Sequence, residues 1–193
     1  MDRERGLHRG ASPPARRRRG EKGAAPAAAA AREALGRSRG GLSTKVHLAC
    51  DERGRPLSVV LTPGQSGDAP RFDEVMAGVR CRTRSGRVRT RPDRVLADKA
   101  YDSRAIRGHL RRRGITATIP QAADRVRNRL AKGSRGGRPP AFDPNAYKQR
   151  NTVERCINRL KQWRGLATRY DKTAHSYMAA LTIASLMIWL ATK

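Results

Sequence analysis

The sequence predicts a mixed α/β (α+β) fold, in which a mixed sheet is flanked by helices. Two β-rich runs at 44–50 and 57–62 are separated by a turn-rich linker, which is the pattern of an antiparallel hairpin. Further along, a short strand at 94–97, a helix at 104–113 and a strand at 115–119 follow in that order. A strand, a helix and a second strand in succession are typical of an α/β layer. We therefore expect these four strands to join one sheet.

Three further segments have helical patterns. Apolar residues recur at helical spacing over 72–79, just after a Pro-Gly pair that ends the preceding strand. Asp143 and Pro144 suit the N-cap and first position of a long helix at 144–163. An apolar run at 175–190 predicts a closing helix. The last two helices should cover the sheet.

Three segments are predicted to be irregular. Residues 1–41 are basic and rich in Ala and Pro, with almost no large apolar side chains, so they cannot offset their ordering entropy. We expect a disordered tail there and a folded part at 42–193. The arginine-rich stretch 80–91 predicts a basic loop. The Gly/Pro-rich stretch 121–140 predicts a flexible loop, which either contacts phosphates or is a solvated linker.

The charge of the chain restricts its partners. Its 193 residues include 43 Lys and Arg against 16 Asp and Glu, a formal net charge of +27. Such an excess repels itself unless a polyanion is near, which favours nucleic acid first and an anionic membrane second. A neutral metabolic enzyme is disfavoured. Aromatic residues make up only 4%, so extensive base stacking is also disfavoured.

The cysteines and the apolar run exclude other classes of protein. Cys50, Cys81 and Cys156 have no CxxC or CxxH pattern, which excludes a disulfide scaffold and a zinc finger and fits a reducing cytosol. The apolar run at 177–191 includes Thr182 and is shorter than the roughly 20 residues of a membrane span. We therefore expect a core helix there.

Two carboxylates lie where functional sites form. Asp98 directly follows the strand at 94–97, and α/β sheets build sites at the C-terminal ends of strands. An aspartate in that place is also a common turn or cap residue. Glu154, on the later long helix, shares one helical face with Arg150 and Lys161. Alone, this is equally the pattern of an ordinary surface ion pair.

The two carboxylates together, on a polycationic background, indicate phosphodiester chemistry. Carboxylate-held Mg²⁺ or Mn²⁺ ions can stabilise the attacking and leaving oxygens of a phosphoryl group, while basic side chains hold the phosphates. The combination therefore favours Asp98 and Glu154 as metal ligands.

Three runs of the chain carry a more specific pattern. They are LGRSRGGLSTKVHLACDERGRPLSVVLTPGQSGDAPRF, RPDRVLADKAYDSRAIRGHLRRRGITATIP and YKQRNTVERCINRLKQWRGLATRYDKTAHSYMAAL. They contain the block Asp98-Lys99-Ala100-Tyr101 and the spaced residues Tyr147, Arg150, Glu154 and Lys161. On these motifs, over roughly residues 35–190, the chain resembles the DDE transposases of insertion sequences, in the group named after insertion sequence five.

The resemblance implies an RNase H-like fold in which three acids bind two metal ions, Mg²⁺ or Mn²⁺, to nick and join DNA ends. Asp98 would be the second acid and Glu154 the third. Residues near the DNA backbone would be Tyr101, Tyr147, Arg150 and Lys161. The implied partners are double-stranded DNA with terminal inverted repeats, and a second copy or a full-length transposase. The implied location is the bacterial cytoplasm, at the nucleoid, with no membrane.

The chain departs from this family at the first acid. In the family, that acid lies on the first, central strand, in a segment resembling W-T-V-S-V-D-S-T-x-V-R-A-H-Q-H upstream of the GRSRGG block. Here none of the upstream acids follows a β-rich run, and none is assigned to the site: Asp2, Glu4, Glu21 and Glu33. We expect a truncated domain that lacks its central strand and cannot hold both metals by itself.

Back-translation suggests an origin for the departure. Read one base later, the codons of Met1 and Asp2 must give Trp, and those of Asp2 and Arg3 must give Ile or Thr. The degenerate bases then permit the rest of the missing strand, including its acid. Residues 1 to roughly 30 are accordingly interpreted as an out-of-frame translation. The rival interpretation is a basic DNA-binding arm.

The sequence leaves three candidate functions for the chain. The first is an insertion-sequence DNA transposase in remnant or second-frame form. The second is a non-catalytic basic protein that occupies element ends or inhibits the full-length transposase, and metal-dependent nicking distinguishes it from the first. A basic structural protein such as a ribosomal component is disfavoured, because it has no use for the two catalytic motifs.

Overall fold

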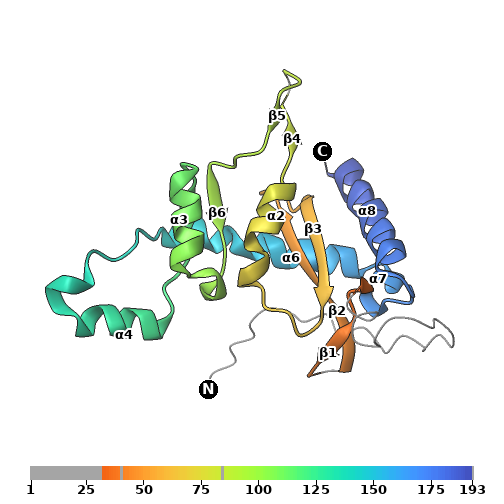
Figure 1. The fold of residues 1–193 in the computed structure, drawn as a ribbon. Helices are drawn as coiled ribbons and strands as arrows, with labels where there is room; N and C mark the ends of the chain where they lie inside the picture. Colours follow the sequence, from red (N-terminus) through yellow and green to blue (C-terminus); the bar gives the residue numbers. More distant parts are fainter. Residues whose placement is uncertain (1–31, 40, 84, 193) are drawn as a thin grey trace. The chain divides into compact units, whose positions relative to one another are not determined.

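A computed structural model describes residues 32–39, 41–83 and 85–192 (Figure 1). The chain divides into two compact units, each described here by itself. The hairpin unit combines the described residues up to Gly67 with those from Thr152 onward, and the Asp98 unit comprises the described residues of 68–151.

An antiparallel sheet organises the hairpin unit. Strands β1 (Gly36–Ser38), β2 (Gly41–Cys50) and β3 (Pro56–Pro63) are paired in that order. The predicted hairpin is confirmed, with Leu48 opposite Val59. β1 lies within 1–41, the segment predicted to be a disordered tail. It has few apolar side chains, but backbone pairing with β2 orders it as a strand. The rest of the predicted tail, at 1–31, lies outside the described residues.

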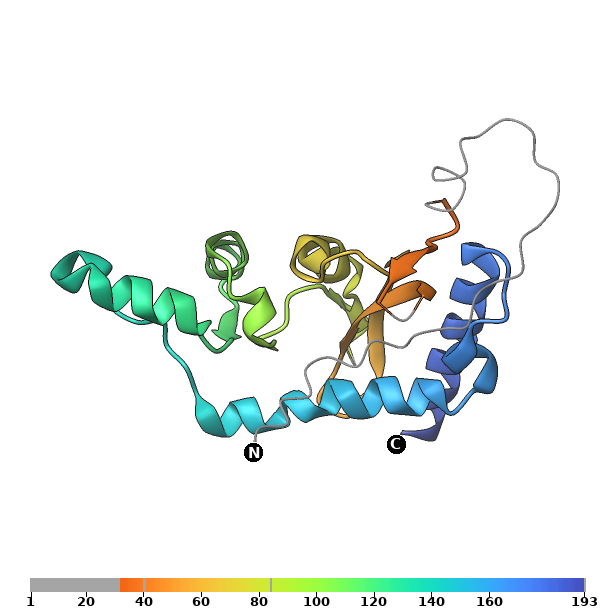
Figure 2. The ribbon, with the colours of Figure 1, turned by 90° about the horizontal axis from the view of Figure 1, so that it is seen from below.

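Helices from the C-terminal part of the chain cover this sheet. They are α6 (Asn151–Lys161), α7 (Arg164–Thr168) and α8 (Ala174–Ala191), so the predicted closing helix is confirmed. α8 lies beside the hairpin in both views of the ribbon (Figure 2). The core of the unit consists of Leu160, Leu166, Tyr177, Leu181, Ala184 and Ile188, packed against Val46, Leu48, Val59 and Leu61 of the hairpin.

Helix α8 is more apolar than its contacts require. Its buried residues lie on one face, whereas Ile183, Leu186 and Leu190 on other faces are more than half exposed. By length and composition alone α8 could span a membrane, with a mean hydropathy of 1.4. One such helix is weak evidence for a membrane protein.

The Asp98 unit is built on a parallel pair of strands. β6 (Arg94–Leu96) and β7 (Thr116–Thr118) pair in parallel and are joined through α3 (Arg104–Arg112). The predicted strand, helix, strand order is confirmed, and Gly114 ends the helix at a φ of 63°. α2 (Phe72–Gly78) packs against them. The core consists of Phe72, Met76, Ile106, Leu110, Ile115 and Ile119.

The long helix predicted at 144–163 is present with an irregular start. Asp143 caps it, accepting hydrogen bonds from the backbone N–H groups of Asn145 and Ala146. A short α5 (Pro144–Tyr147) then continues through a 3₁₀ turn at Lys148–Arg150 into α6. The cap and the position of Pro144 are as predicted.

Three predictions about the fold are wrong. The four predicted strands do not join one sheet, since the described residues form one three-stranded and two two-stranded sheets. The predicted loop at 80–91 contains a small hairpin of β4 (Cys81–Arg82) and β5 (Val88–Arg89). The predicted loop at 121–140 contains α4 (Ala123–Ala131), with no buried residue. Helix formers such as Ala, Leu and Arg support α4 without an apolar face.

Candidate functional site

Asp98 lies at the carboxyl edge of the parallel strands, as predicted. It follows β6 and caps a 3₁₀ turn at Lys99–Tyr101, where it accepts a hydrogen bond from the backbone N–H of Ala100 at 3.0 Å. Its other carboxylate oxygen lies 3.9 Å from Nη2 of Arg150, and 14% of the Asp98 side chain is exposed. Asp98 is therefore a cap residue as well as a candidate ligand, and one of its oxygens faces a cation.

Tyr101 belongs to the same cluster of side chains. Burial raises the pKa of its hydroxyl, and the negative charges of Asp68 and Asp98 raise it further. The Arg150 guanidinium acts in the opposite direction. Because these charges act on one phenol, Asp68, Asp98, Tyr101 and Arg150 lie near one another within the Asp98 unit.

Asp68 is a residue that sequence reasoning missed. It lies at the start of a 3₁₀ turn at Ala69–Arg71, and its side chain is partly buried. Local pattern marks it only as a residue before a Pro-containing turn, which is a common place for aspartate. Its position near Asp98 follows from the fold of the unit.

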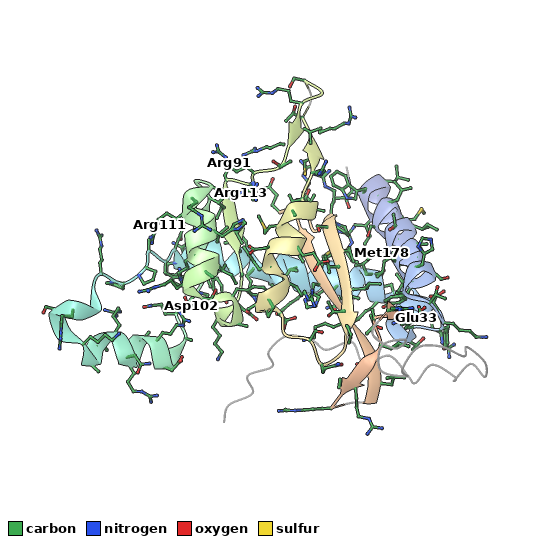
Figure 3. All side chains as sticks on the ribbon, in the orientation of Figure 1. Glu33, Arg91, Asp102, Arg111, Arg113 and Met178 are labelled. Atoms are coloured by element: carbon green, nitrogen blue, oxygen red, sulfur yellow. The ribbon has the colours of Figure 1, made fainter. Side chains whose placement is uncertain are left out.

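A second missed carboxylate, Asp102, has a structural role. Its side chain is only 2% exposed and accepts hydrogen bonds from Nε of Arg107 at 2.6 Å and from the backbone N–H of Ala122 at 3.0 Å (Figure 3). These bonds join the beginning of α3 to the segment after β7. Asp102 is therefore committed to the fold, although it stands only four residues from Asp98.

Of the predicted residues on the later helix, Arg150 lies near Asp98. Glu154 and Lys161 lie on α6 in the hairpin unit, and both are partly buried. Tyr147 belongs to the Asp98 unit and packs against Phe142, with ring centroids 5.2 Å apart. The sharing of a metal ion by Asp98 and Glu154 therefore stays a prediction.

Glu33, one of the upstream acids, supports the hairpin unit. Its carboxylate accepts a hydrogen bond from the backbone N–H of Ala174 at 2.7 Å, at the start of α8. Its carbonyl oxygen accepts a second bond, from the guanidinium of Arg169, which is 2% exposed. Arg169 also donates to Thr44. Glu33 is thus used as a helix cap.

The donor atoms found in the described residues suit a hard cation but do not complete a site. Carboxylate oxygens are the ligands that Mg²⁺ and Mn²⁺ prefer. Among the residues that the structure describes, no group of three or more His, Cys, Asp or Glu side chains could hold a metal ion. Two adjacent divalent ions need more carboxylates than Asp98 alone supplies.

A carboxylate and an arginine at the carboxyl edge of parallel strands, in a strongly basic chain, are typical of proteins that process nucleic acids. Comparison with known proteins identifies the family: the transposase DDE domain matches residues 16–190. The chain belongs to this family of DDE transposases. Its mixed architecture of helices and small sheets agrees with the RNase H-like fold expected for the family.

Two relatives are named as transposases of insertion sequences. A protein named as a transposase for insertion sequence element IS6501 of Brucella ovis is 31% identical over 149 residues, which cover 77% of this chain and 99% of the relative. One named for element IS402 of Burkholderia cepacia is 30% identical over 151 residues, which cover 75% of this chain and 62% of the relative. No solved structure matches the chain.

Proposed function

We propose that this chain is the part of an insertion-sequence transposase that carries its second and third catalytic acids, Asp98 and Glu154. The observation that carries the proposal is the position of Asp98, two residues after the end of β6, at the carboxyl edge of a parallel pair and beside the charge of Arg150. Family membership supports the same assignment.

The proposed substrate is double-stranded DNA at the terminal inverted repeats of the element. A net charge of +27 provides strong attraction to phosphates. Arg150 would hold a phosphate near Asp98, and Tyr101 would line the same place from the 3₁₀ turn. Tyr147, before Arg150 in the sequence, and Lys161, after it, would also contact the DNA backbone.

Asp98 and Glu154 would supply carboxylate oxygens to Mg²⁺ or Mn²⁺. When bound, such ions stabilise the attacking and leaving oxygens of a phosphodiester. With only these two acids the chain is one ligand short, so we propose that it does not cleave DNA alone. Residues 1 to roughly 30, as an out-of-frame translation, would account for the lost acid.

A second candidate is a non-catalytic protein that occupies element ends or joins the full-length transposase in a mixed oligomer. Among the described residues no group of three or more metal-binding side chains is present, which favours this candidate, since DNA binding needs only the positive charge of the chain. Either protein would work in the cytoplasm, at the nucleoid.

Two measurements on the purified chain test the proposal. Duplex DNA with the element's terminal repeat should bind in preference to a scrambled duplex of equal length, at an ionic strength near physiological. A strand-cleavage assay with Mg²⁺ or Mn²⁺ should give only background. Equal affinity for both duplexes would contradict the assignment of element ends as substrate. Metal-dependent nicking would exclude the non-catalytic candidate and would also contradict the proposal that the chain is one ligand short.

A further inference from the structure

Two cysteines far apart in the sequence meet in the hairpin unit. Cys50 is the last residue of β2, directly after a shift in the register between β2 and β3, and it is partly exposed. Cys156 is fully buried in the middle of α6. The two side chains interact with each other.

Contacts on both sides of Cys156 confirm that the end of β2 packs on this face of α6. One turn before it, a Cβ added at Gly54 would lie 3.6 Å from Cγ2 of Thr152. Almost one turn after it, Nη1 of Arg159 donates to the carbonyl oxygen of Arg53 at 3.5 Å. Thr152, Cys156 and Arg159 lie on one helical face. The turn after β2 is thus held against α6 at two points around the thiol pair.

The two thiols differ in their exposure. Cys156 is fully buried, whereas Cys50 is partly exposed and is the one that a solute can reach first. A partly exposed thiol beside a buried one is the arrangement of an attacking and a resolving cysteine.

We propose that Cys50 and Cys156 form a reversible intramolecular disulfide when the chain meets a peroxide. The Cys50 thiolate attacks one peroxide oxygen, the O–O bond breaks, and Cys50 becomes a sulfenic acid while hydroxide leaves. The Cys156 sulfur then attacks the sulfenic sulfur, and its proton leaves with the displaced hydroxide as water. In sum, two thiols and one hydrogen peroxide give one disulfide and two waters, and two electrons pass from sulfur to oxygen. Reduction by an excess of thiol reverses the step.

The disulfide would fix the end of β2 to the helix that carries Glu154, two residues before Cys156. It would close a loop of roughly a hundred residues, for which the loss of unfolded-state entropy is large. Disulfides in a reducing cytosol are usually transient and regulatory, so this bond would mark an oxidising episode. The proposal does not depend on whether the chain cleaves DNA.

Peptide mapping of the full chain tests the proposal directly. The reduced protein is treated with one equivalent of hydrogen peroxide, free thiols are blocked with N-ethylmaleimide, and trypsin then releases Cys50 within 46–53 and Cys156 within 156–159. We expect these two peptides to be cross-linked in the monomer and separated again by dithiothreitol. The oxidised chain should unfold at a temperature roughly 5–15 °C higher than the reduced chain.

Three variants complete the test. Cys81→Ser removes the third thiol and should leave the cross-link unchanged. Cys156→Ser should prevent the cross-link and leave a sulfenic acid on Cys50 that dimedone traps, and Cys50→Ser should leave Cys156 unmodified. Blocked thiols at both positions after peroxide, or a cross-link through Cys81, would overturn the proposal. If a variant does not fold, peptide mapping of the unsubstituted chain still shows whether Cys50 and Cys156 are cross-linked.

Discussion

The Nη2 atom of Arg150 lies 3.9 Å from Oδ2 of Asp98, at the outer limit of an ion pair. Both α3 and α4 lie between the two residues in the sequence, so it is the fold of the Asp98 unit that brings them together. The guanidinium offsets part of the carboxylate's charge and leaves a cation beside the edge where DNA phosphates would lie. Arg150 thus lies beside the candidate metal ligand, and we expect it to contact a DNA phosphate there.

Substituting Arg150 should weaken binding to element-end DNA. Arg150→Gln removes one phosphate contact, and the slope of log K against log salt should fall by about 0.9. Fluorescence anisotropy with the terminal-repeat duplex at several salt concentrations measures both effects. Arg16→Gln removes the same charge from the N-terminal segment and should change the affinity little. Equal effects of the two substitutions would show that only net charge matters.

Asp98 and Asp102 should separate function from stability. Asp102→Ala breaks a buried ion pair with Arg107 and leaves the Ala122 N–H without its acceptor, which should lower the free energy of unfolding by about 3–5 kcal/mol. Asp98→Ala removes a cap and a loose ion pair with Arg150, and it should cost about 1 kcal/mol. Urea denaturation of both variants measures the difference. A larger loss for Asp98→Ala would make Asp98 a mainly structural residue.

Tyr177 should make the chain sensitive to alkaline pH. Its buried hydroxyl donates to the carbonyl oxygen of Leu166 at 2.8 Å, and burial raises its pKa. The folded state then holds the phenol proton more tightly than the unfolded state does. Stability is therefore fully present below the unfolded pKa of about 10 and is lost as the pH rises through the folded pKa.

Tyr177→Phe should reduce the unfolding free energy at pH 7 by about 1 kcal/mol and should flatten the loss of stability above pH 10. Tyr170→Phe is the matched control, because Tyr170 is 62% exposed and should leave stability at pH 7 unchanged. Denaturation curves between pH 7 and pH 11 measure both. An unchanged alkaline slope in Tyr177→Phe would assign the loss to other groups, such as Tyr101.

Sequence patterns predicted the elements better than their assembly. The hairpin at 44–62, α3 and α8 have strong local periodicity, and each is confirmed. Strand pairing depends on contacts between distant residues, which local patterns do not contain, so the expected single sheet is wrong. The small α4 was missed because helix propensity without an apolar face leaves no periodic signal.

In the candidate site, too, features that depend on neighbouring residues were predicted, and features that depend on distant residues were not. The place of Asp98 after a strand was predicted because it depends only on neighbouring residues. Its proximity to Asp68, the buried role of Asp102 and the contact between Cys50 and Cys156 all depend on segments brought together by folding. Glu33 had no local signal as a cap, because the helix that it caps begins 141 residues later.

The last prediction concerns the missing acid. Each Mg²⁺ requires near-octahedral oxygen ligands, and two adjacent dications need more than two carboxylates to offset their repulsion. Asp98 and Glu154 supply two, so the chain with Mg²⁺ or Mn²⁺ and terminal-repeat DNA should show no cleavage above background.

A protein that carries the one-base-shifted segment W-[IT]-V-S-V-D-S-T in place of the N-terminus, joined to the protein encoded upstream, should cleave. In that restored protein, Asp98→Ala or Glu154→Ala should abolish cleavage and leave DNA binding nearly intact, because a lost metal ligand affects chemistry more than phosphate contacts.

Cleavage by the chain as it stands would show that a local acid replaces the lost one. Glu33 is occupied at the start of α8, so Asp68, which lies near Asp98 and Tyr101, would then be the acid to substitute first, with Asp68→Asn expected to remove the activity.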